Sequence, residues 1–217
     1  MKLVLISDTH LNLVKNLPIG DVLVHCGDWS GRGSLVDLQI FCNQIKIYKQ
    51  QFKHVLCVPG NHDWNAYDHG PLTKLSIEEA GGVYLHDAEI IIDGVKFYGS
   101  GWQPAFCDWA FNLPRGQALQ DKWDMIPDDV EVLLTHSPPH GILDKLDEHG
   151  SVPGEHVGCW NLKNTIVSRL KKLKVNSFGH IHCNGGRIDI QNGVTYVNAA
   201  VLNEEYKQKQ LPIVVEI

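Results

Sequence analysis

The sequence lacks the features that mark membrane-spanning and disulfide-rich proteins. No apolar run approaches the roughly 20 residues that a membrane-spanning helix needs, and the apolar segment at residues 1–6 is too short for the core of a signal peptide. The six cysteines are scattered without a Cys-x-x-Cys pair, which favours reduced thiols over structural zinc. We therefore expect a cytoplasmic protein without a membrane partner.

Positively charged side chains are also fewer than negatively charged ones. The chain has 19 lysines and arginines against 25 aspartates and glutamates, a formal net charge of −6. This balance argues against an extended nucleic-acid surface, which needs many phosphate contacts. Internal repeats, low-complexity segments and linkers are absent, and 217 residues suffice for one core. We expect a single domain over residues 1–217, with no evident protein partner.

Short apolar runs alternate with segments of helical periodicity, which is typical of an α/β fold with a parallel or mixed sheet. Strands are expected at residues 3–6, 22–26, 54–58, 130–134, 175–178 and 212–217. Helices are expected after the N-cap Ser34 and over residues 71–80 and 162–173. Asp93-Gly94 and Asn192-Gly193 predict hairpins over residues 90–98 and 186–197.

Polar clusters follow five of the predicted strands: Asp8-Thr9-His10, Gly27-Asp28, Gly60-Asn61-His62-Asp63, Thr135-His136 and Gly179-His180-Ile181-His182. Ligands of open α/β sheets bind beyond the carboxyl ends of the strands, so these clusters should converge. Their imidazole and carboxylate donors suit a pair of divalent metals. A carboxylate at Asp28 could bridge two ions at the separation typical of hydrolytic two-metal sites.

In this order, Asp-x-His, Gly-Asp, Gly-Asn-His-Asp, Thr-His and Gly-His-x-His resemble the motifs of the calcineurin-like metallophosphoesterase superfamily. The resemblance extends from Asp8 to His182. Segments 102–116, 134–141 and 198–203 further resemble the metallophosphoesterase-domain-containing subgroup, which is similar to class III cyclic nucleotide phosphodiesterases. The implied fold is α/β, a four-layer α/β/β/α sandwich of two mixed sheets flanked by helices, with the metal site at one rim.

Carried over by motif, the resemblance implies seven metal ligands: Asp8, His10 and His182 for one ion, Asn61, His136 and His180 for the other, and Asp28 between them. The implied cofactor is a pair of divalent ions. Manganese is the preferred candidate, and iron, zinc, cobalt, nickel and magnesium are the alternatives. His62 would be the catalytic histidine, which protonates the leaving oxygen or stabilises charge on the phosphoryl oxygens. Asp63 would orient His62 or cap the following helix.

Four further side chains are candidates for substrate binding: Arg32, Trp102, Phe106 and Arg115. The aromatic residues of this segment, which also include Trp109 and Phe111, form either a wall on which a nucleobase stacks or a packed flap. Arg115 contacts phosphate or caps carbonyl groups. Protein serine/threonine phosphatases place an aspartate and then an arginine after Gly-Asp. Here Gly31 replaces that aspartate although Arg32 matches, which weakens the protein-phosphatase interpretation.

The expected activity is hydrolysis of a phosphodiester by a metal-bridging hydroxide. A nucleotide or a 2′,3′- or 3′,5′-cyclic nucleotide is the expected small-molecule substrate. A phosphomonoesterase or a nuclease on the same dimetal site is the alternative among enzymes. A non-catalytic binding scaffold of the same fold is a further alternative, which the complete ligand set and the presence of His62 disfavour.

Overall fold

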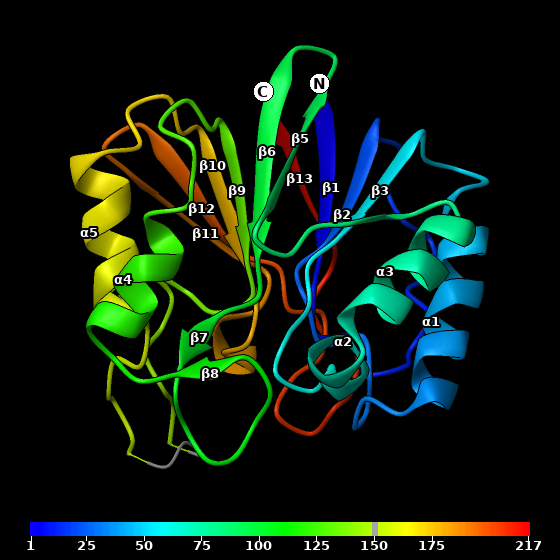
Figure 1. Ribbon diagram of the computed structural model, residues 1–217, viewed down its shortest axis with the longest axis horizontal. Helices are drawn as coiled ribbons and strands as arrows, with labels where there is room; N and C mark the ends of the chain where they lie inside the picture. The colour runs from blue at the N-terminus through cyan, green and yellow to red at the C-terminus, as the bar shows by residue number, and fades with distance from the viewer. Residues whose placement is uncertain (149–151) are drawn as a thin grey trace.

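Two mixed β-sheets lie face to face between two layers of helices in the computed structural model, which describes residues 1–148 and 152–217 (Figure 1). The first sheet has the strand order β13-β1-β2-β3-β4 and the second β11-β12-β10-β9-β6-β5. The helices α1 to α3 lie on the outer side of the first sheet, and α4 and α5 lie on the outer side of the second. The expected α/β/β/α sandwich is confirmed.

The strands of the first sheet are β1 (Lys2–Ile6), β2 (Val22–His25), β3 (His54–Cys57), β4 (Val83–Tyr84) and β13 (Ile213–Glu216). Those of the second are β5 (Ala88–Ile92), β6 (Val95–Ser100), β9 (Val132–Thr135), β10 (Val175–Phe178), β11 (Arg187–Gln191) and β12 (Val194–Asn198). A separate two-stranded ladder consists of β7 (Gln103–Pro104) and β8 (Asn112–Leu113). The helices are α1 (Leu35–Tyr48), α2 (Trp64–Asp68), α3 (Gly70–Glu79), α4 (Gln117–Trp123), α5 (Trp160–Ser168) and the 3₁₀ turn η1 (His182–Asn184).

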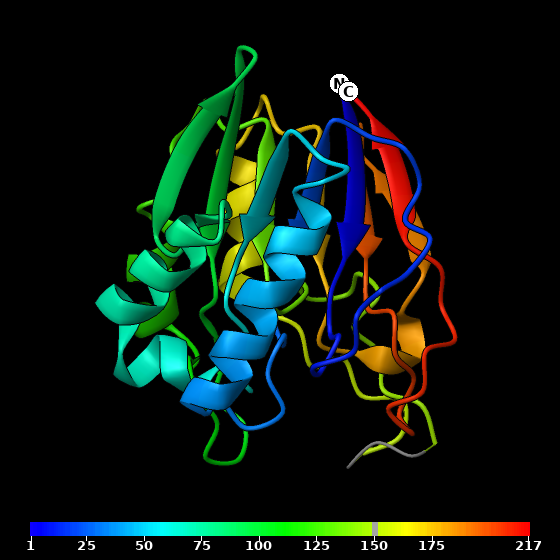
Figure 2. The ribbon, with the colours of Figure 1, turned by 90° about the vertical axis from the view of Figure 1, so that its right-hand side faces the viewer.

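Parallel pairing brings the ends of successive strands to one edge. β1 pairs with β2 in a register that sets Ile6 opposite His25, and β9 pairs with β10 with Leu134 opposite Ser177. The loops that follow each pair of strands therefore leave the sheet side by side. An isolated parallel bridge between Ser7 and Ala200 connects the two sheets at this edge. In Figure 2 the chain termini lie at the opposite end of β1.

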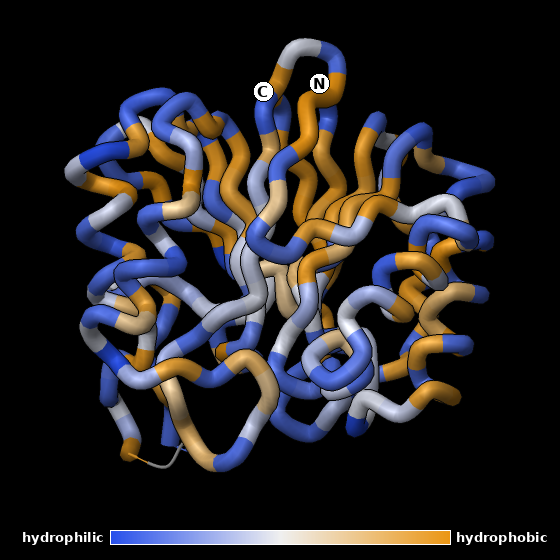
Figure 3. The backbone as a smooth tube through the Cα atoms, viewed as in Figure 1, coloured by the Kyte–Doolittle hydropathy of each residue, from blue (hydrophilic) through white to orange (hydrophobic). Residues whose placement is uncertain are grey.

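Three apolar layers hold the sandwich together. Alternate residues of β1 point in opposite directions: Leu3 and Leu5 belong to the core between the sheets, whereas Val4 and Ile6 face the side covered by α1 and α3. A third cluster packs α4 and α5 against the second sheet. In Figure 3 the central strands carry the hydrophobic colour over most of their length, as expected for strands buried on both faces.

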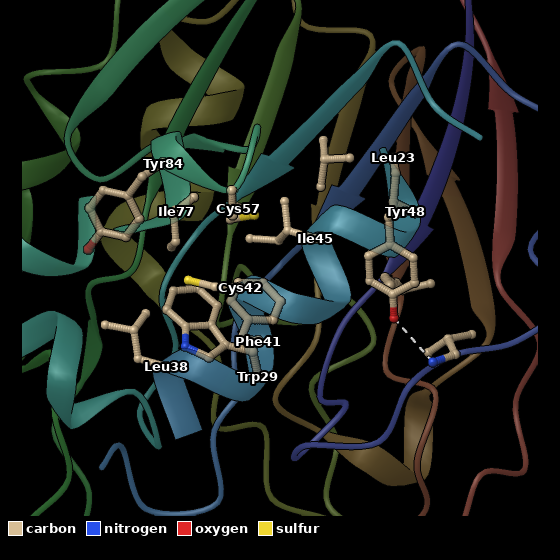
Figure 4. Close-up of a cluster of buried hydrophobic side chains, with 14 of the residues drawn as sticks. Leu23, Trp29, Leu38, Phe41, Cys42, Ile45, Tyr48, Cys57, Ile77 and Tyr84 are labelled. Carbon is tan, nitrogen blue, oxygen red and sulfur yellow. Dashed lines mark hydrogen bonds between the residues drawn. The ribbon is translucent and has the colours of Figure 1, made fainter. Parts of the chain in front are cut away.

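The helix α1 anchors the first sheet from outside (Figure 4). The Trp29 indole stacks on Phe41 with ring centroids 4.6 Å apart and planes 5° from parallel. The Tyr48 hydroxyl accepts a hydrogen bond from the N–H of Val14 at 3.1 Å, the dashed line in Figure 4. The Ser34 hydroxyl accepts from the N–H of Asp37, so the predicted N-cap is confirmed.

The two predicted hairpins are confirmed as β5–β6 and β11–β12, and all six cysteines are free thiols. The helix expected over residues 162–173 is α5, which begins at Trp160 and ends at Ser168. The prediction overran because Leu170 and Leu173 are buried in the same cluster although their backbone forms turns. The short elements α2, α4, β4, β7 and β8 were not predicted. In the described ranges, the structure contains no helix whose length and apolar content would allow it to cross a bilayer.

We predict that Phe97→Ala lowers the free energy of unfolding by about 3–5 kcal/mol, because a fully buried aromatic ring is lost and leaves a cavity. Phe97 is 0% exposed in the core between the sheets. The matched control is Ile91→Ala on the neighbouring strand, 60% exposed, which should change stability by no more than about 0.5 kcal/mol. Urea unfolding measures both, and equal losses would contradict the layered core.

Candidate metal centre

The structure brings all seven predicted metal ligands to one rim. Each lies within four residues of the end of β1, β2, β3, β9 or β10, where the loops of the two sheets meet. Most are buried, and Asp8, Asp28, Asn61 and His136 are each exposed by 2% or less. The convergence expected from the polar clusters is therefore present in the fold.

The first group of donors comprises Asp8, His10 and His182, whose ligand atoms lie within 4.8 Å of one another. The Nδ1 atoms of His10 and His182 each lie 3.0 Å from a backbone carbonyl oxygen, that of Ser30 and that of Asn203 respectively. An Nδ1–H donated to a carbonyl leaves Nε2 as the free donor atom for a metal. Nε2 of His182 lies 3.3 Å from Oδ1 of Asp8.

The second group comprises Asp8, Asp28 and His136. Nδ1 of His136 lies 2.8 Å from the carbonyl oxygen of Cys26, and Nε2 lies 2.9 Å from Oδ1 of Asn61 and 3.4 Å from Oδ2 of Asp28. Asp28 also belongs to a further group with His10 and His62. Asp28 is thus shared between donor groups and would be the ligand common to two ions.

His180 contacts Asp8 through its backbone. Its N–H lies 3.1 and 3.0 Å from the two carboxylate oxygens of Asp8, and its ring centroid is 5.0 Å from that of His136. Its ring belongs to none of the compact donor groups among the described residues. The ligand role of His180 therefore stays a prediction that rests on the motif.

The site contains a buried nitrogen atom that lacks a hydrogen-bond partner and that a metal could bind. Nε2 of His10 is buried and has no hydrogen-bond partner among the described residues, which is costly for a polar atom unless something binds it. Oxygen and imidazole donors without thiolate are suited to the divalent ions of hydrolytic sites. The residues present therefore fit a pair of divalent ions.

Four of the predicted ligands have a strained backbone. Asp8, His10, Asp28 and His180 have φ values of 54°, 41°, 57° and 68°, in the left-handed region that few non-glycine residues adopt. Each such residue costs about 1–2 kcal/mol. Hydrogen bonds between the loops hold this conformation, with the N–H of Asp8 donating to Gly27 at 2.9 Å and that of His10 to Asp28 at 3.0 Å.

The glycines of the motifs allow the loops to approach one another. A Cβ on Gly27 would lie 2.5 Å from Nδ1 of His136. A Cβ on Gly60 would overlap Oδ1 of Asp28, and a Cβ on Gly179 would overlap the carboxylate of Asp8. A side chain at any of these positions would displace a predicted metal ligand.

Carboxylates and imidazoles shift each other's pKa at this rim. Burial lowers the pKa of His136, but the charge and hydrogen bond of Asp28, the charge of Asp8 and the hydrogen bond to Cys26 together outweigh burial and raise it to about 9. For His182, the hydrogen bond and charge of Asp8 likewise outweigh burial and raise the pKa to about 9. Burial dominates at His180, where it lowers the pKa to about 3. Without metal, two imidazolium groups thus balance the two buried carboxylates.

Asp63 has a role that differs from both predicted alternatives. Its carboxylate is fully buried and accepts hydrogen bonds from the N–H groups of Gly60, Asp28 and Ser30 at 2.8, 2.9 and 3.0 Å. It precedes α2, but its side chain makes no capping hydrogen bond. Asp63 instead ties the loop after β2 to the loop after β3.

A pocket of about 310 Å³ opens beside the ligands. Its walls include His62 and the aromatic side chains of Phe106, Trp109 and Tyr206. The N–H of His62 donates to Oδ1 of Asp28 at 2.8 Å, and its Nδ1 lies 2.7 Å from the carbonyl oxygen of Gly31. Tyr206, which also lines the pocket, belongs to no sequence motif and was not predicted.

Of the four candidates for substrate binding, only Phe106 lines this pocket. Trp102 donates through Nε1 to Asp87 at 2.8 Å and packs against the apolar cluster on the outer side of the first sheet, which is the packed alternative. The Arg115 guanidinium donates to the carbonyl oxygens of Val157 and Gly158 at 2.7 and 2.8 Å, which is the carbonyl-capping alternative. Arg32 is exposed and does not line the pocket.

A rim of carboxylates and imidazoles on an α/β/β/α sandwich defines the class of dinuclear metallohydrolases. A family model described as calcineurin-like phosphoesterase matches residues 1–184. The chain belongs to this family, whose members use a dimetal site, and it is thereby assigned to the metal-dependent phosphoester hydrolases. The family resemblance inferred from the motifs is confirmed.

The similar proteins agree with this assignment. Human metallophosphoesterase domain-containing protein 1 is 35% identical to the chain, with 100% of the chain and 71% of that protein covered. UPF0046 protein T07D4.2 of Caenorhabditis elegans is 32% identical, with coverages of 94% and 56%. The crystal structure of phosphopantetheinyl hydrolase from Mycobacterium tuberculosis shares the fold, with a TM-score of 0.62 and 14% identity over 94% of this chain and 90% of that one.

We predict that Gly60→Ala loses at least one bound metal, because the added methyl group would displace Asp28 from its place between the donor groups. Gly70→Ala is the matched control, since a Cβ there meets nothing within 4 Å. Metal content after dialysis, measured by plasma mass spectrometry, compares the two variants. Wild-type metal content in Gly60→Ala would contradict the placement of Asp28.

We predict that metal binding releases about two protons at pH 7.5. His136 and His182, both with a pKa raised to about 9, are protonated in the metal-free chain, whereas a metal binds neutral imidazole. As the pH approaches 9, the number of protons released should fall and the affinity for metal should rise. Titration calorimetry in two buffers of different ionisation enthalpy measures the number, and identical enthalpies in both buffers would refute it.

Proposed function

We propose that the chain is a phosphodiesterase that acts on a small nucleotide or cyclic nucleotide. Its cofactor would be two divalent ions, with manganese as the preferred candidate. The observation that carries this proposal is the charge of the pocket beside the metal ligands. Among the described residues that line it, none is lysine or arginine, while Asp147 and Glu204 lie on its wall. A phosphodiester has one negative charge and a phosphomonoester up to two, so such a pocket favours the diester.

The metals, when bound, would supply Lewis acidity and an activated water. The chain's own residues hold and orient the reactants around them. Asp8, His10 and His182 would bind one ion, and Asn61, His136 and His180 the other, with Asp28 shared. His62 keeps Nδ1 engaged with the Gly31 carbonyl, so that Nε2 is the nitrogen free to protonate the leaving oxygen.

The aromatic lining supports a nucleotide rather than an extended nucleic acid. Phe106, Trp109 and Tyr206 offer ring faces on which a base can stack, which is worth about 1–3 kcal/mol per base. The volume of about 310 Å³ is at the small end of ligand pockets. The acidic wall and the net charge of −6 would repel the further phosphates of a long strand. Cytoplasmic location remains part of the same proposal.

The test is hydrolysis by metal-stripped protein with and without added manganese. The panel comprises bis(p-nitrophenyl) phosphate, p-nitrophenyl phosphate, and 2′,3′- and 3′,5′-cyclic nucleotides. We expect manganese to restore activity, with kcat/KM at least about tenfold higher for the diester than for the monoester because the pocket supplies no positive side chain. Asp28→Ala should abolish restored turnover.

A higher kcat/KM for the monoester would overturn the diester proposal and favour the phosphomonoesterase. Unchanged activity in Asp28→Ala would show that hydrolysis comes from elsewhere. If protein with two bound metals cleaves no member of the panel, the proposed substrate class is wrong and the binding-scaffold alternative is favoured.

A further inference from the structure

We propose that Trp109 is a positioning residue for His62, held in place by the loop between β7 and β8 (residues 105–111). The inference rests on the proposed function, because it assigns a role to His62 as the group that protonates the leaving oxygen. Trp109 bears no metal-binding atom, and its contribution would be to fix the direction of the His62 ring.

The stacking geometry is the first observation. The ring centroids of Trp109 and His62 lie 4.2 Å apart with planes 26° from parallel, so the indole covers one face of the imidazole. The ring of His10 approaches His62 edge-on at 4.6 Å, and the Gly31 carbonyl lies 2.7 Å from Nδ1 of His62. Together these contacts restrict rotation of the imidazole and leave Nε2 as its free nitrogen.

The loop that carries Trp109 is fixed at its base. β7 pairs with β8, and Nε2 of Gln103 donates to Oδ1 of Asn112 at 3.0 Å. The Nδ2 group of Asn112 donates to the carbonyl oxygens of Phe106 and Cys107 at 2.8 and 3.1 Å. A two-stranded ladder with these cross-links gives the loop a defined shape that its length alone would not.

The same loop is attached to the metal centre. The N–H of Ala110, next to Trp109, donates to the carbonyl oxygen of Asn61, which precedes His62, at 3.3 Å. Phe111 is 2% exposed in the core, and its φ of 56° turns the chain back into the fold. Trp109 is therefore held close to the backbone of Asn61, the residue directly before the histidine that it helps to orient.

The catalytic consequence follows from the position of Nε2. A proton donor must lie within hydrogen-bond reach of the leaving oxygen, and displacement by about 1 Å can cost on the order of 100-fold in rate. Without the indole, one face of the His62 ring is open and the ring can rotate about its Gly31 hydrogen bond. The loss falls on proton donation and spares leaving groups that depart without a proton.

The experiment compares aryl methyl phosphodiesters whose leaving groups range from p-nitrophenol to phenol, with manganese-loaded protein. For Trp109→Ala we expect kcat for the phenyl ester to fall at least about tenfold more than kcat for the p-nitrophenyl ester, with KM changed less than threefold. Trp109→Phe should restore most of the rate. In the His62→Ala background, Trp109→Ala should cause no further loss for the phenyl ester.

The matched control is Trp160→Ala. Trp160 also stacks on a histidine, with its ring 3.8 Å from that of His140 and planes 22° apart, but it does not line the pocket. This variant should keep the wild-type dependence on the leaving group. Metal content is measured for every variant, and we expect two ions in each.

Three outcomes would overturn the role of Trp109 while leaving the proposed function intact. They are an equal fall for both esters, a Trp109→Ala loss that adds to that of His62→Ala, and loss of metal from Trp109→Ala. Wild-type protein that hydrolyses none of the esters would instead overturn the proposed function, so the two failures are distinguishable.

Discussion

The buried carboxylate of Asp28 is the constraint on which the rim depends. A negative charge at this depth is costly unless opposite charge and hydrogen bonds compensate it. The N–H of His62 donates to one oxygen, and Nε2 of His136 lies 3.4 Å from the other. The same charge raises the pKa of His136 against the effect of burial. One side chain thus connects the loops after β2, β3 and β9, and places their donors around a common centre.

Maintaining that centre requires backbone conformations that the loops would not adopt alone. The backbone φ angles of Asp8 and Asp28 lie in the left-handed region. Glycine is needed at positions 27 and 60 because neighbouring predicted ligands occupy the space that a Cβ would take. The register of β1 with β2 and of β9 with β10 carries these loops away from the sheets side by side. The stability of the three apolar layers therefore offsets the strain, and strain of this kind concentrates at functional sites.

The sequence predicts those parts of the molecule that follow from periodicity and strand order. Buried strands followed by polar clusters indicate an α/β fold and the convergence of those clusters, whereas the α/β/β/α sandwich and the assignment of the seven ligands come from the family resemblance of the motifs. Contacts between loops distant in the chain have no comparable signal. The carboxylate of Asp63 has the same sequence neighbours whether it caps α2 or, as it does, receives N–H groups from Gly60, Asp28 and Ser30. Likewise, Tyr206 reaches the pocket from a segment without periodicity, and Leu170 and Leu173 continue an apolar pattern past the end of α5.

The ligands and the pocket walls come from different parts of the fold. The ligands follow strand ends and are fixed by the two sheets, whereas Phe106, Trp109, Glu204 and Tyr206 belong to loops around the opening. With no lysine or arginine among the described lining residues, the walls contribute shape, ring faces and negative charge, and attraction for phosphate would fall to the bound metal ions. The loop at 105–111 joins the two parts, since it presents Trp109 to His62 while its Ala110 N–H donates to Asn61. On the proposed function, a change in that loop would therefore alter the selection of substrate and the orientation of His62 together.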